Sequence, residues 1–182
     1  TSEGVDVLDL GEVATDTVYF VSGSRSMPGV MITASHNPAE YNGIKLCGPG
    51  AAPVGVDSGL GDIKAMILAG ITPGSGVGTI TAFDPVLPYV DHLFSVVDAS
   101  KIAPLRVAVD GGNGMAGVVV ERVFDRLSAE IIGLYLEPDG TFPNHPADPL
   151  QPENLADLVA LMGRERPDLG VAFDGDADRA FF

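Results

Sequence analysis

The sequence predicts an α/β protein in which strands and helices alternate along the chain and stack as layers. Short apolar runs typical of strands alternate with segments of helical periodicity. Apolar residues make up 46% of the 182 residues, which is enough to form a core. The 23 glycines and 14 prolines follow no period, which indicates many turns rather than a collagen-like or low-complexity chain. Alternating elements of this kind favour α/β layers.

The first part of the chain contains five expected elements. Strands are expected at residues 5–10, 29–33 and 43–47, and helices at 15–23 and 57–68. The first strand, VDVLDL, alternates apolar and acidic residues, and the second, GVMIT, is an apolar run typical of a buried strand. The second helix would place Ile63, Met66 and Ile67 on one face.

The segment GITPGSGVG at residues 70–78 has the composition of a linker and separates two expected domains, 1–78 and 79–182. In the second domain, helices are expected at 85–97, 115–127 and 153–162, and strands at 105–110, 131–136 and 169–173, with another strand starting at 180–182. The length of the chain also fits one or two domains.

The composition excludes several classes of protein. The formal net charge of −15 repels nucleic acid and anionic membranes, so neither is expected as a partner. No apolar run approaches the roughly 20 residues of a membrane span, and no signal peptide is expected from the first residues of the sequence. Cys47 is the only cysteine, which is compatible with a reducing cytosol, and a cytoplasmic location is expected. The chain opens on Thr1 without a methionine, which is compatible with a native N-terminus further upstream.

The loop Thr33–Pro38, with the sequence TASHNP, follows the strand expected at 29–33. Because α/β proteins place ligands at such strand ends, Ser35 is a candidate nucleophile, and a serine can carry a phosphoryl group. The competing interpretation is a polar turn with Ser35 as a cap and Pro38 as its end. A hydrolase triad is not expected, because the loop lacks the G-x-S-x-G elbow and the neighbouring Ser35 and His36 side chains point apart on an extended segment.

A second polar loop, DGDADR, follows the strand expected at 169–173. Its carboxylates, on Asp174, Asp176 and Asp178, can converge on one hard cation when the loop curls, and Mg²⁺ prefers such oxygen ligands. Arg179 could then hold phosphate oxygens through its planar fork of donors. An EF-hand is excluded because Arg179 stands where that calcium loop requires glycine. A solvated acidic turn is the competing interpretation.

Together, TASHNP-x-x-YNGIK and FDGDADR resemble the α-D-phosphohexomutase family, in particular its bacterial phosphomannomutase/phosphoglucomutase members. Most of the chain contributes, because VDVLDLG, GVMITASHNPAEYNGIK, VAVDGGNGMAG, FPNHPADP and VAFDGDADR occur in the family's order. The pairing of the two loops is more specific than either loop alone. The resemblance implies family-type α/β domains with mixed sheets, and an isomerase that moves a phosphoryl group within a hexose phosphate.

The resemblance also implies roles for the residues that match the family's motifs. Ser35 would be the phosphoserine that gives and takes the phosphoryl group. Asp174, Asp176 and Asp178 would bind Mg²⁺, with an oxygen of the phosphoryl group on Ser35 as a further ligand. Arg179 would contact the phosphoryl region.

Lys45 and His36 match family positions near the reacting oxygens. Lys45 is either a general acid/base, since burial and neighbours can tune the pKa of a lysine, or a charge that positions phosphate. His36 would position the loop. The partners implied are a hexose phosphate and a hexose bisphosphate, which forms between two phosphoryl transfers. The sugar is mannose or glucose, with glucosamine as a weaker third choice.

The family has four domains in a chain more than twice as long as this one. An N-terminal segment with an active-site arginine, the sugar-recognition loop of the third domain and the phosphate-clamping fourth domain have no counterpart in these 182 residues. These missing domains of the same chain are expected partners. Because positioning of the sugar supplies much of the catalysis, the 182 residues alone are expected to be inactive.

Two other functions remain open from the sequence. Gly112–Gly117 fits G-x-G-x-x-G after a strand and Glu130 lies roughly 20 residues on, so a Rossmann-type dinucleotide-binding domain is one alternative. Asp110 beside that turn would repel a pyrophosphate, and the family has a similar turn for packing. A non-catalytic Mg²⁺-binding module is the other alternative. Asn144 and His145 in FPNHPADP are expected to shape a loop, with no catalytic role.

Overall fold

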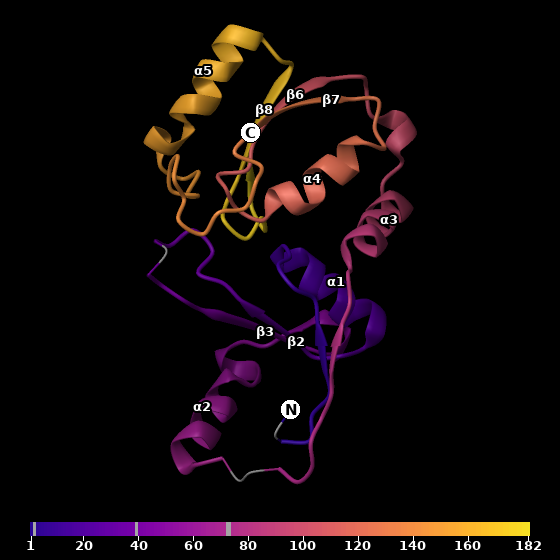
Figure 1. Ribbon diagram of the computed structural model, residues 1–182, viewed down its shortest axis with the longest axis vertical. Coiled ribbons are helices and arrows are strands. Elements are labelled where there is room, and N and C mark those ends of the chain that lie inside the picture. The colour runs from indigo at the N-terminus through magenta and orange to yellow at the C-terminus, as the bar shows by residue number, and fades with distance from the viewer. Residues whose placement is uncertain (2, 39, 72–73) are drawn as a thin grey trace.

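The structure is a computed structural model that describes residues 1, 3–38, 40–71 and 74–182 (Figure 1). Its strands are β1 Val7–Asp9, β2 Gly29–Ile32, β3 Ile44–Gly48, β4 Ala52–Pro53, β5 Ile80–Ala82, β6 Arg106–Asp110, β7 Glu130–Leu134, β8 Leu169–Phe173 and β9 Ala180–Phe181. Its α-helices are α1 Thr15–Arg25, α2 Leu60–Ala69, α3 Val86–Val96, α4 Ala116–Phe124 and α5 Ala156–Glu165. The predicted α/β class with mixed sheets is confirmed.

The four-stranded sheet has the order β7-β6-β8-β9, and its first three strands are parallel while β9 runs antiparallel to β8. Because successive side chains of a strand face opposite ways, β6 contributes side chains to the packing on both faces of the sheet. Val107 and Val109 belong to the cluster that packs with α4, whereas Ala108 packs with Leu158 and Leu161 of α5. The helices therefore cover the two faces of this sheet, at the top of Figure 1.

Two loops meet at the edge where these parallel strands end. β6 ends at Asp110 and leads into the glycine-rich turn, and β8 ends at Phe173 and leads into the acidic loop Asp174–Arg179. Since β6 and β8 are parallel neighbours, their carboxyl ends lie side by side. The strand expected at 169–173 has the observed bounds, so the acidic loop begins where the sequence predicted.

The antiparallel sheet β2-β3-β4 holds the TASHNP loop in a hairpin. Its register pairs Met31 with Lys45 and Ile32 with Ile44, so Lys45 lies beside the start of that loop. The prediction that the strand at 29–33 is buried was wrong, because Val30 and Ile32 are 59% and 72% exposed. Only the face of β2 and β3 that contacts α1 is covered in the part of the chain that the structure describes.

The short strand β5 was not predicted, and it pairs in parallel with β1. β5 follows the expected linker at 70–78, of which residues 72 and 73 lie outside the described residues. The domain division at residue 78 stays a prediction. Helix α2 confirms the helix expected at 57–68, and its apolar face is exposed, with Met66 at 62%.

Helix α3 confirms the helix expected at 85–97 and links the antiparallel part of the chain to the four-stranded sheet. The Phe20 ring of α1 lies 5.6 Å from that of Tyr89 and 5.1 Å from that of His92, both on α3. Aromatic contacts at such distances stabilise the packing of the two helices. Within the described residues, no helix combines the length and the apolar character needed to span a membrane.

We expect Gly117→Ala to lower the free energy of unfolding by about 1–3 kcal/mol or more, the range typical of overpacking. A Cβ atom at Gly117, in α4, would collide with the backbone carbonyl of Leu136, which cannot rotate away. Gly163→Ala in α5 is the matched control, since a Cβ atom there meets open space. It should raise stability by up to about 1 kcal/mol. Urea denaturation of both variants in the intact protein checks this, and a wild-type midpoint for Gly117→Ala would contradict it.

Candidate active site

The TASHNP loop presents Ser35 by a local turn. The backbone N–H of Ser35 donates to Oγ1 of Thr33 at 2.8 Å, and both the backbone and side-chain nitrogens of Asn37 donate to the Ala34 carbonyl, at 3.0 and 2.8 Å. Such side-chain bonds favour turns over strand continuation. Ser35 has a φ of 55°, so it lies in the left-handed region that most residues avoid. This conformation directs its hydroxyl toward the acidic loop.

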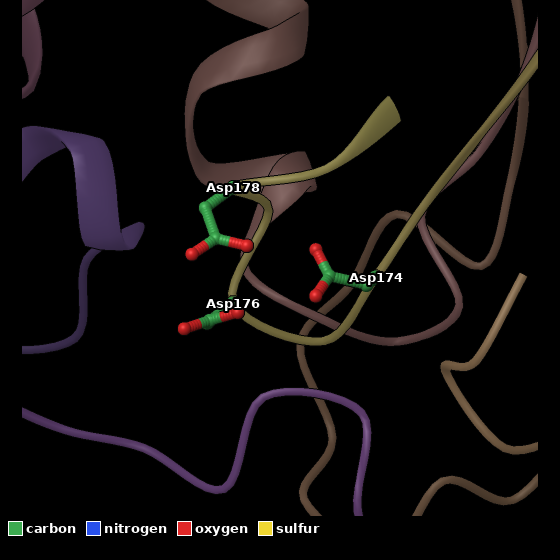
Figure 2. Close-up of side chains that lie close together, drawn as sticks. All are labelled: Asp174, Asp176 and Asp178. Carbon is green, nitrogen blue, oxygen red and sulfur yellow. The ribbon is translucent and has the colours of Figure 1, made fainter. Parts of the chain in front are cut away.

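The acidic loop closes on itself and gathers its three carboxylates. The Arg179 backbone N–H donates to Oδ1 of Asp174 at 3.1 Å, and the Ala177 N–H donates to the Asp174 carbonyl at 3.0 Å. Ala177 has a φ of 59°, which tightens the turn. One carboxylate oxygen each from Asp174, Asp176 and Asp178 lie within 4.8 Å of one another. Figure 2 shows the three side chains close together along the curl of the loop.

The two loops meet through Ser35, Asp174 and Arg179. The Ser35 hydroxyl donates to Oδ2 of Asp174 at 2.9 Å. Nη2 of Arg179 donates to the same Asp174 oxygen at 2.6 Å and to Ser35 Oγ at 3.1 Å. The approach requires glycine at Gly175, because a Cβ atom there would collide with the Ser35 carbonyl oxygen. The predicted nucleophile and the predicted metal loop are therefore in direct contact.

His36 lies beside Ser35 rather than opposite to it. Its Nδ1 is 3.4 Å from Ser35 Oγ and accepts a bond from Nη2 of Arg179 at 2.6 Å. A nitrogen that accepts carries no proton, so a neutral His36 holds its proton on Nε2. The prediction that these neighbouring side chains point apart was wrong, because the backbone of Ser35 has a left-handed and not an extended conformation. The loop still lacks a triad, since Nδ1 of His36 is engaged by Arg179.

Lys45 from β3 bridges two of the carboxylates. Its Nζ lies 2.6 Å from Oδ2 of Asp176 and 2.5 Å from Oδ2 of Asp178. Burial raises the pKa of Asp176, but hydrogen bonds from Lys45 and Thr15 outweigh it and bring that pKa below its ordinary value. Partial burial lowers the pKa of Lys45, and the bonds to Asp176 and Asp178 raise it above its ordinary value. Lys45 is therefore an ammonium in this arrangement.

Sequence reasoning missed the start of α1, which docks on the acidic loop. The Thr15 hydroxyl donates to Oδ2 of Asp176 at 2.6 Å, and the Thr15 N–H donates to the Asp176 carbonyl at 3.0 Å. Loss of hydration and then the negative charges of Asp178 and Asp176 raise the pKa of Asp16, although its side chain is exposed. These partners are about 160 positions apart in the chain, and no local pattern marks Thr15 or Asp16 as neighbours of the triad.

The residues present fit a divalent cation. Oδ1 of Asp176 is buried and has no hydrogen-bond partner among the described residues, so one carboxylate oxygen is left to accept a further positive group. Among the described residues, three carboxylates also face only two cationic side chains at this site, those of Lys45 and Arg179. Oxygen ligands of this type suit a hard cation.

The glycine-rich turn packs against the protein itself. Gly114 lies against Gly175, since a Cβ atom at Gly114 would stand 2.6 Å from the Gly175 carbonyl oxygen. Glu130, the acid that the dinucleotide alternative required, pairs with Arg106 at 3.4 Å. These contacts support a packing role for the turn rather than cofactor binding.

Comparison with known families defines the class of this chain. Residues 1–69 match the phosphoglucomutase/phosphomannomutase α/β/α domain I, and residues 87–182 match the α/β/α domain II of the same family. The chain therefore belongs to the phosphoglucomutase/phosphomannomutase family, which confirms the resemblance seen in its motifs.

Individual relatives agree with this assignment. The chain is 39% identical to a phosphomannomutase from Salmonella montevideo, an alignment that covers 98% of this chain and 41% of that protein. It is 38% identical to a phosphoglucomutase from Neisseria gonorrhoeae, over 98% of this chain and 38% of the relative. A crystal structure of a family protein from Burkholderia thailandensis superposes with a TM-score of 0.83 at 37% identity, over 98% of this chain and 40% of that one. The chain thus spans about two fifths of the length of these relatives.

We expect Thr15→Val to lower the free energy of unfolding by about 1.5–3 kcal/mol, because it removes a hydroxyl that donates to a buried carboxylate. Thr17→Val is the matched control on the same helix, since the Thr17 hydroxyl is buried without a partner among the described residues, and it should be neutral or stabilising. Denaturation in the presence of a chelator measures both. Equal effects of the two substitutions would contradict the role of Thr15.

The cost of Thr15→Val should also depend on pH. The pKa of Asp176 is lowered in the folded protein, so the stability that its charge contributes is present above its unfolded value of 3.8 and is lost as the pH falls through the folded value. The difference between wild type and Thr15→Val should therefore be constant above about pH 5 and shrink in more acidic solution. A difference that grows on acidification would contradict this.

Proposed function

We propose that the intact protein is a phosphohexomutase that interconverts hexose 1-phosphate and hexose 6-phosphate through a phosphoserine at Ser35. The observation that carries the proposal is the contact of Ser35 with Asp174 and Arg179, which joins a candidate nucleophile to a candidate cation site. Relatives named phosphomannomutase and phosphoglucomutase support mannose and glucose phosphates as substrates. The activity is proposed for the intact protein, and the 182 residues alone are expected to turn over no substrate.

The proposed reaction has two phosphoryl transfers. In the first, a sugar hydroxyl oxygen forms a bond to the phosphorus on Ser35, the bond between phosphorus and Ser35 Oγ breaks, and the proton of the sugar hydroxyl is transferred, by way of an enzyme group, to Ser35 Oγ. A hexose bisphosphate results. After the sugar reorients, Ser35 Oγ forms a bond to the other phosphorus, the bond between that phosphorus and the sugar oxygen breaks, and the proton of Ser35 returns to the sugar oxygen. Such transfers depend on positioning and on neutralisation of charge.

The balance of charges at the acidic loop supports the proposal of a bound cation. A phosphoryl group on Ser35 adds about −1.5 to −2 charges next to three carboxylates, and in the described part of the chain only Lys45 and Arg179 oppose them there. Asp174, Asp176 and Asp178 would hold Mg²⁺ together with an oxygen of that phosphoryl group. When bound, Mg²⁺ would draw charge from the transferring group.

Lys45, Arg179 and His36 have distinct proposed parts. Arg179 donates to Ser35 Oγ and would hold the phosphoryl group in place. His36 accepts from Arg179 and so orients that guanidinium. Lys45 is held as an ammonium, which suits either a proton donor to the leaving oxygen or a charge that positions phosphate. To accept a proton from the sugar, Lys45 must first lose its own proton, which the bonds to Asp176 and Asp178 oppose because they raise its pKa.

We expect Ser35→Ala to lose at least about 1,000-fold in mutase activity in the intact protein, because the covalent step is removed. After incubation with a hexose bisphosphate, mass spectrometry should locate phosphate on Ser35 in the wild type and none in the variant. Ser95→Ala, an exposed serine of α3, is the control and should keep full activity. An active Ser35→Ala variant with phosphate on another residue would defeat the assignment.

We expect replacement of Asp174, Asp176 or Asp178 by Asn to weaken Mg²⁺ binding at least about 10-fold, since even removal of an outer support of a metal ligand has effects of this size. Asp98→Asn, an exposed acid that caps a turn and pairs with Lys101 away from this site, is the control for a change of charge. Calorimetry measures the affinities. Unchanged binding in all three variants would rule out this cation site. A wild-type protein that binds Mg²⁺ through these three carboxylates but carries no transferable phosphoryl group would instead favour a non-catalytic binding module.

A further inference from the structure

A buried carboxylate, that of Asp110, pairs with the partly buried His145 next to the glycine-rich turn. Asp110, at the end of β6, is 1% exposed, and its Oδ2 lies 3.1 Å from Nε2 of His145. Its other oxygen, Oδ1, accepts the backbone N–H of Gly112 at 2.9 Å. Asp110 therefore ties the segment 144–147 to the glycine-rich turn. The mechanism above uses neither residue.

Both ring nitrogens of His145 face acceptors. Nε2 faces the Asp110 carboxylate, and Nδ1 lies 2.9 Å from the carbonyl oxygen of Pro146. A neutral imidazole has only one N–H, so only the imidazolium can donate to both. The hydrogen bond to Asp110 raises the pKa of His145 and outweighs the opposing effect of burial.

The surroundings of His145 also favour the cation. The Tyr135 ring meets the His145 ring edge to face, with 5.4 Å between their centres. The Tyr135 hydroxyl donates to Oδ2 of Asp157 on α5 at 2.8 Å. Asp110 and Asp157 are the charged groups that act on His145 from β6 and α5, and both are acidic. Loss of the His145 proton would therefore leave a buried carboxylate without its counter-charge.

The pair is connected to the acidic loop by short backbone contacts. Ala147 is 4% exposed and packs between Gly112 and Gly175, since Cβ atoms at these glycines would lie 3.2 and 3.6 Å from its own. The Met115 N–H donates to the Gly175 carbonyl at 2.9 Å. Gly175 stands between two of the candidate cation ligands, so the turn and the segment 144–147 together support that loop.

We propose that the Asp110–His145 pair is a positioning device that holds the glycine-rich turn and the segment 144–147 against Gly175 and so fixes the acidic loop. The effect on Mg²⁺ rests on the proposed function, whereas the effect on the loop backbone does not. The pKa of His145 is raised on folding, so its contribution is complete below its unfolded value of 6.5 and is lost as the pH rises through the folded value.

The sign of the pH dependence of Mg²⁺ affinity distinguishes the effect of His145 from the titration of the ligands themselves. Carboxylate ligands are already ionised above about pH 6, and protonation of ligands can only make cation affinity rise with pH. An affinity that falls as the pH rises therefore points to a group such as His145 that supports the loop only when it is protonated.

The test uses the intact protein and compares wild type, His145→Gln and His92→Gln between about pH 6 and pH 9. His92 is an exposed histidine of α3 outside this network and is the matched control. The protection factor of the Met115 amide, from hydrogen exchange, reports the contact with Gly175. Calorimetry gives the dissociation constant for Mg²⁺, and NMR gives the pKa of His145.

As the pH rises, we expect two changes in wild type and His92→Gln: the protection of the Met115 amide falls, and the Mg²⁺ dissociation constant rises about 3- to 10-fold. Both changes should have the same midpoint as the titration of His145. His145→Gln, which keeps a donor for Asp110 without a charge, should show weaker binding that does not vary with pH. Should that variant fail to fold, the shared midpoint in wild type still decides. Two results would overturn the proposal. One is equal protection of the Met115 amide in wild type and His145→Gln at the acidic end of the pH range, and the other is a wild-type midpoint for this protection that differs from that of the His145 titration. Absence of Mg²⁺ binding in wild type would defeat the proposed function instead, and Met115 protection would still test the pair.

Discussion

Three carboxylates within 4.8 Å of one another repel each other, and the arrangement of the site depends on how that repulsion is offset. Arg179 lies in the acidic loop itself, but Lys45 comes from β3 and the Thr15 hydroxyl comes from α1. The loop is therefore stabilised only when the hairpin and α1 pack against it. The same packing brings Ser35 to Asp174, so the interactions that offset the repulsion also assemble the candidate active site.

Close backbone approach is the second requirement. Gly175 lets the acidic loop touch the Ser35 backbone on one side and the glycine-rich turn on the other. A side chain at either contact would separate the elements and move the carboxylates away from the hydroxyl. The glycine-rich turn thus acts through packing, which explains why a pattern shared with dinucleotide-binding loops occurs in a chain of this family.

The acidic character of the chain does not conflict with an anionic substrate. A net charge of −15 acts at long range, where salt screens it, whereas Lys45, Arg179 and a bound cation would act at contact distance. The chain is about equally similar to relatives named for mannose and for glucose phosphates, at 39% and 38% identity. This is understandable if these residues handle the phosphoryl group, which both sugars share, rather than the sugar ring.

The sequence by itself determined the α/β class, most of the strands and helices, and the two loops that carry the candidate residues. Apolar periodicity is local and strong in segments such as 169–173, and carboxylates at alternate positions of one loop can be recognised without a fold. Only the tertiary structure decided which partners reach those carboxylates. Thr15 and Lys45 are more than 130 positions away from Asp176, and the exposure of Val30 depends on what covers its sheet. Long-range contacts leave no periodic signal in the chain, because they are fixed by how the sheets and helices pack and not by the order of neighbouring residues.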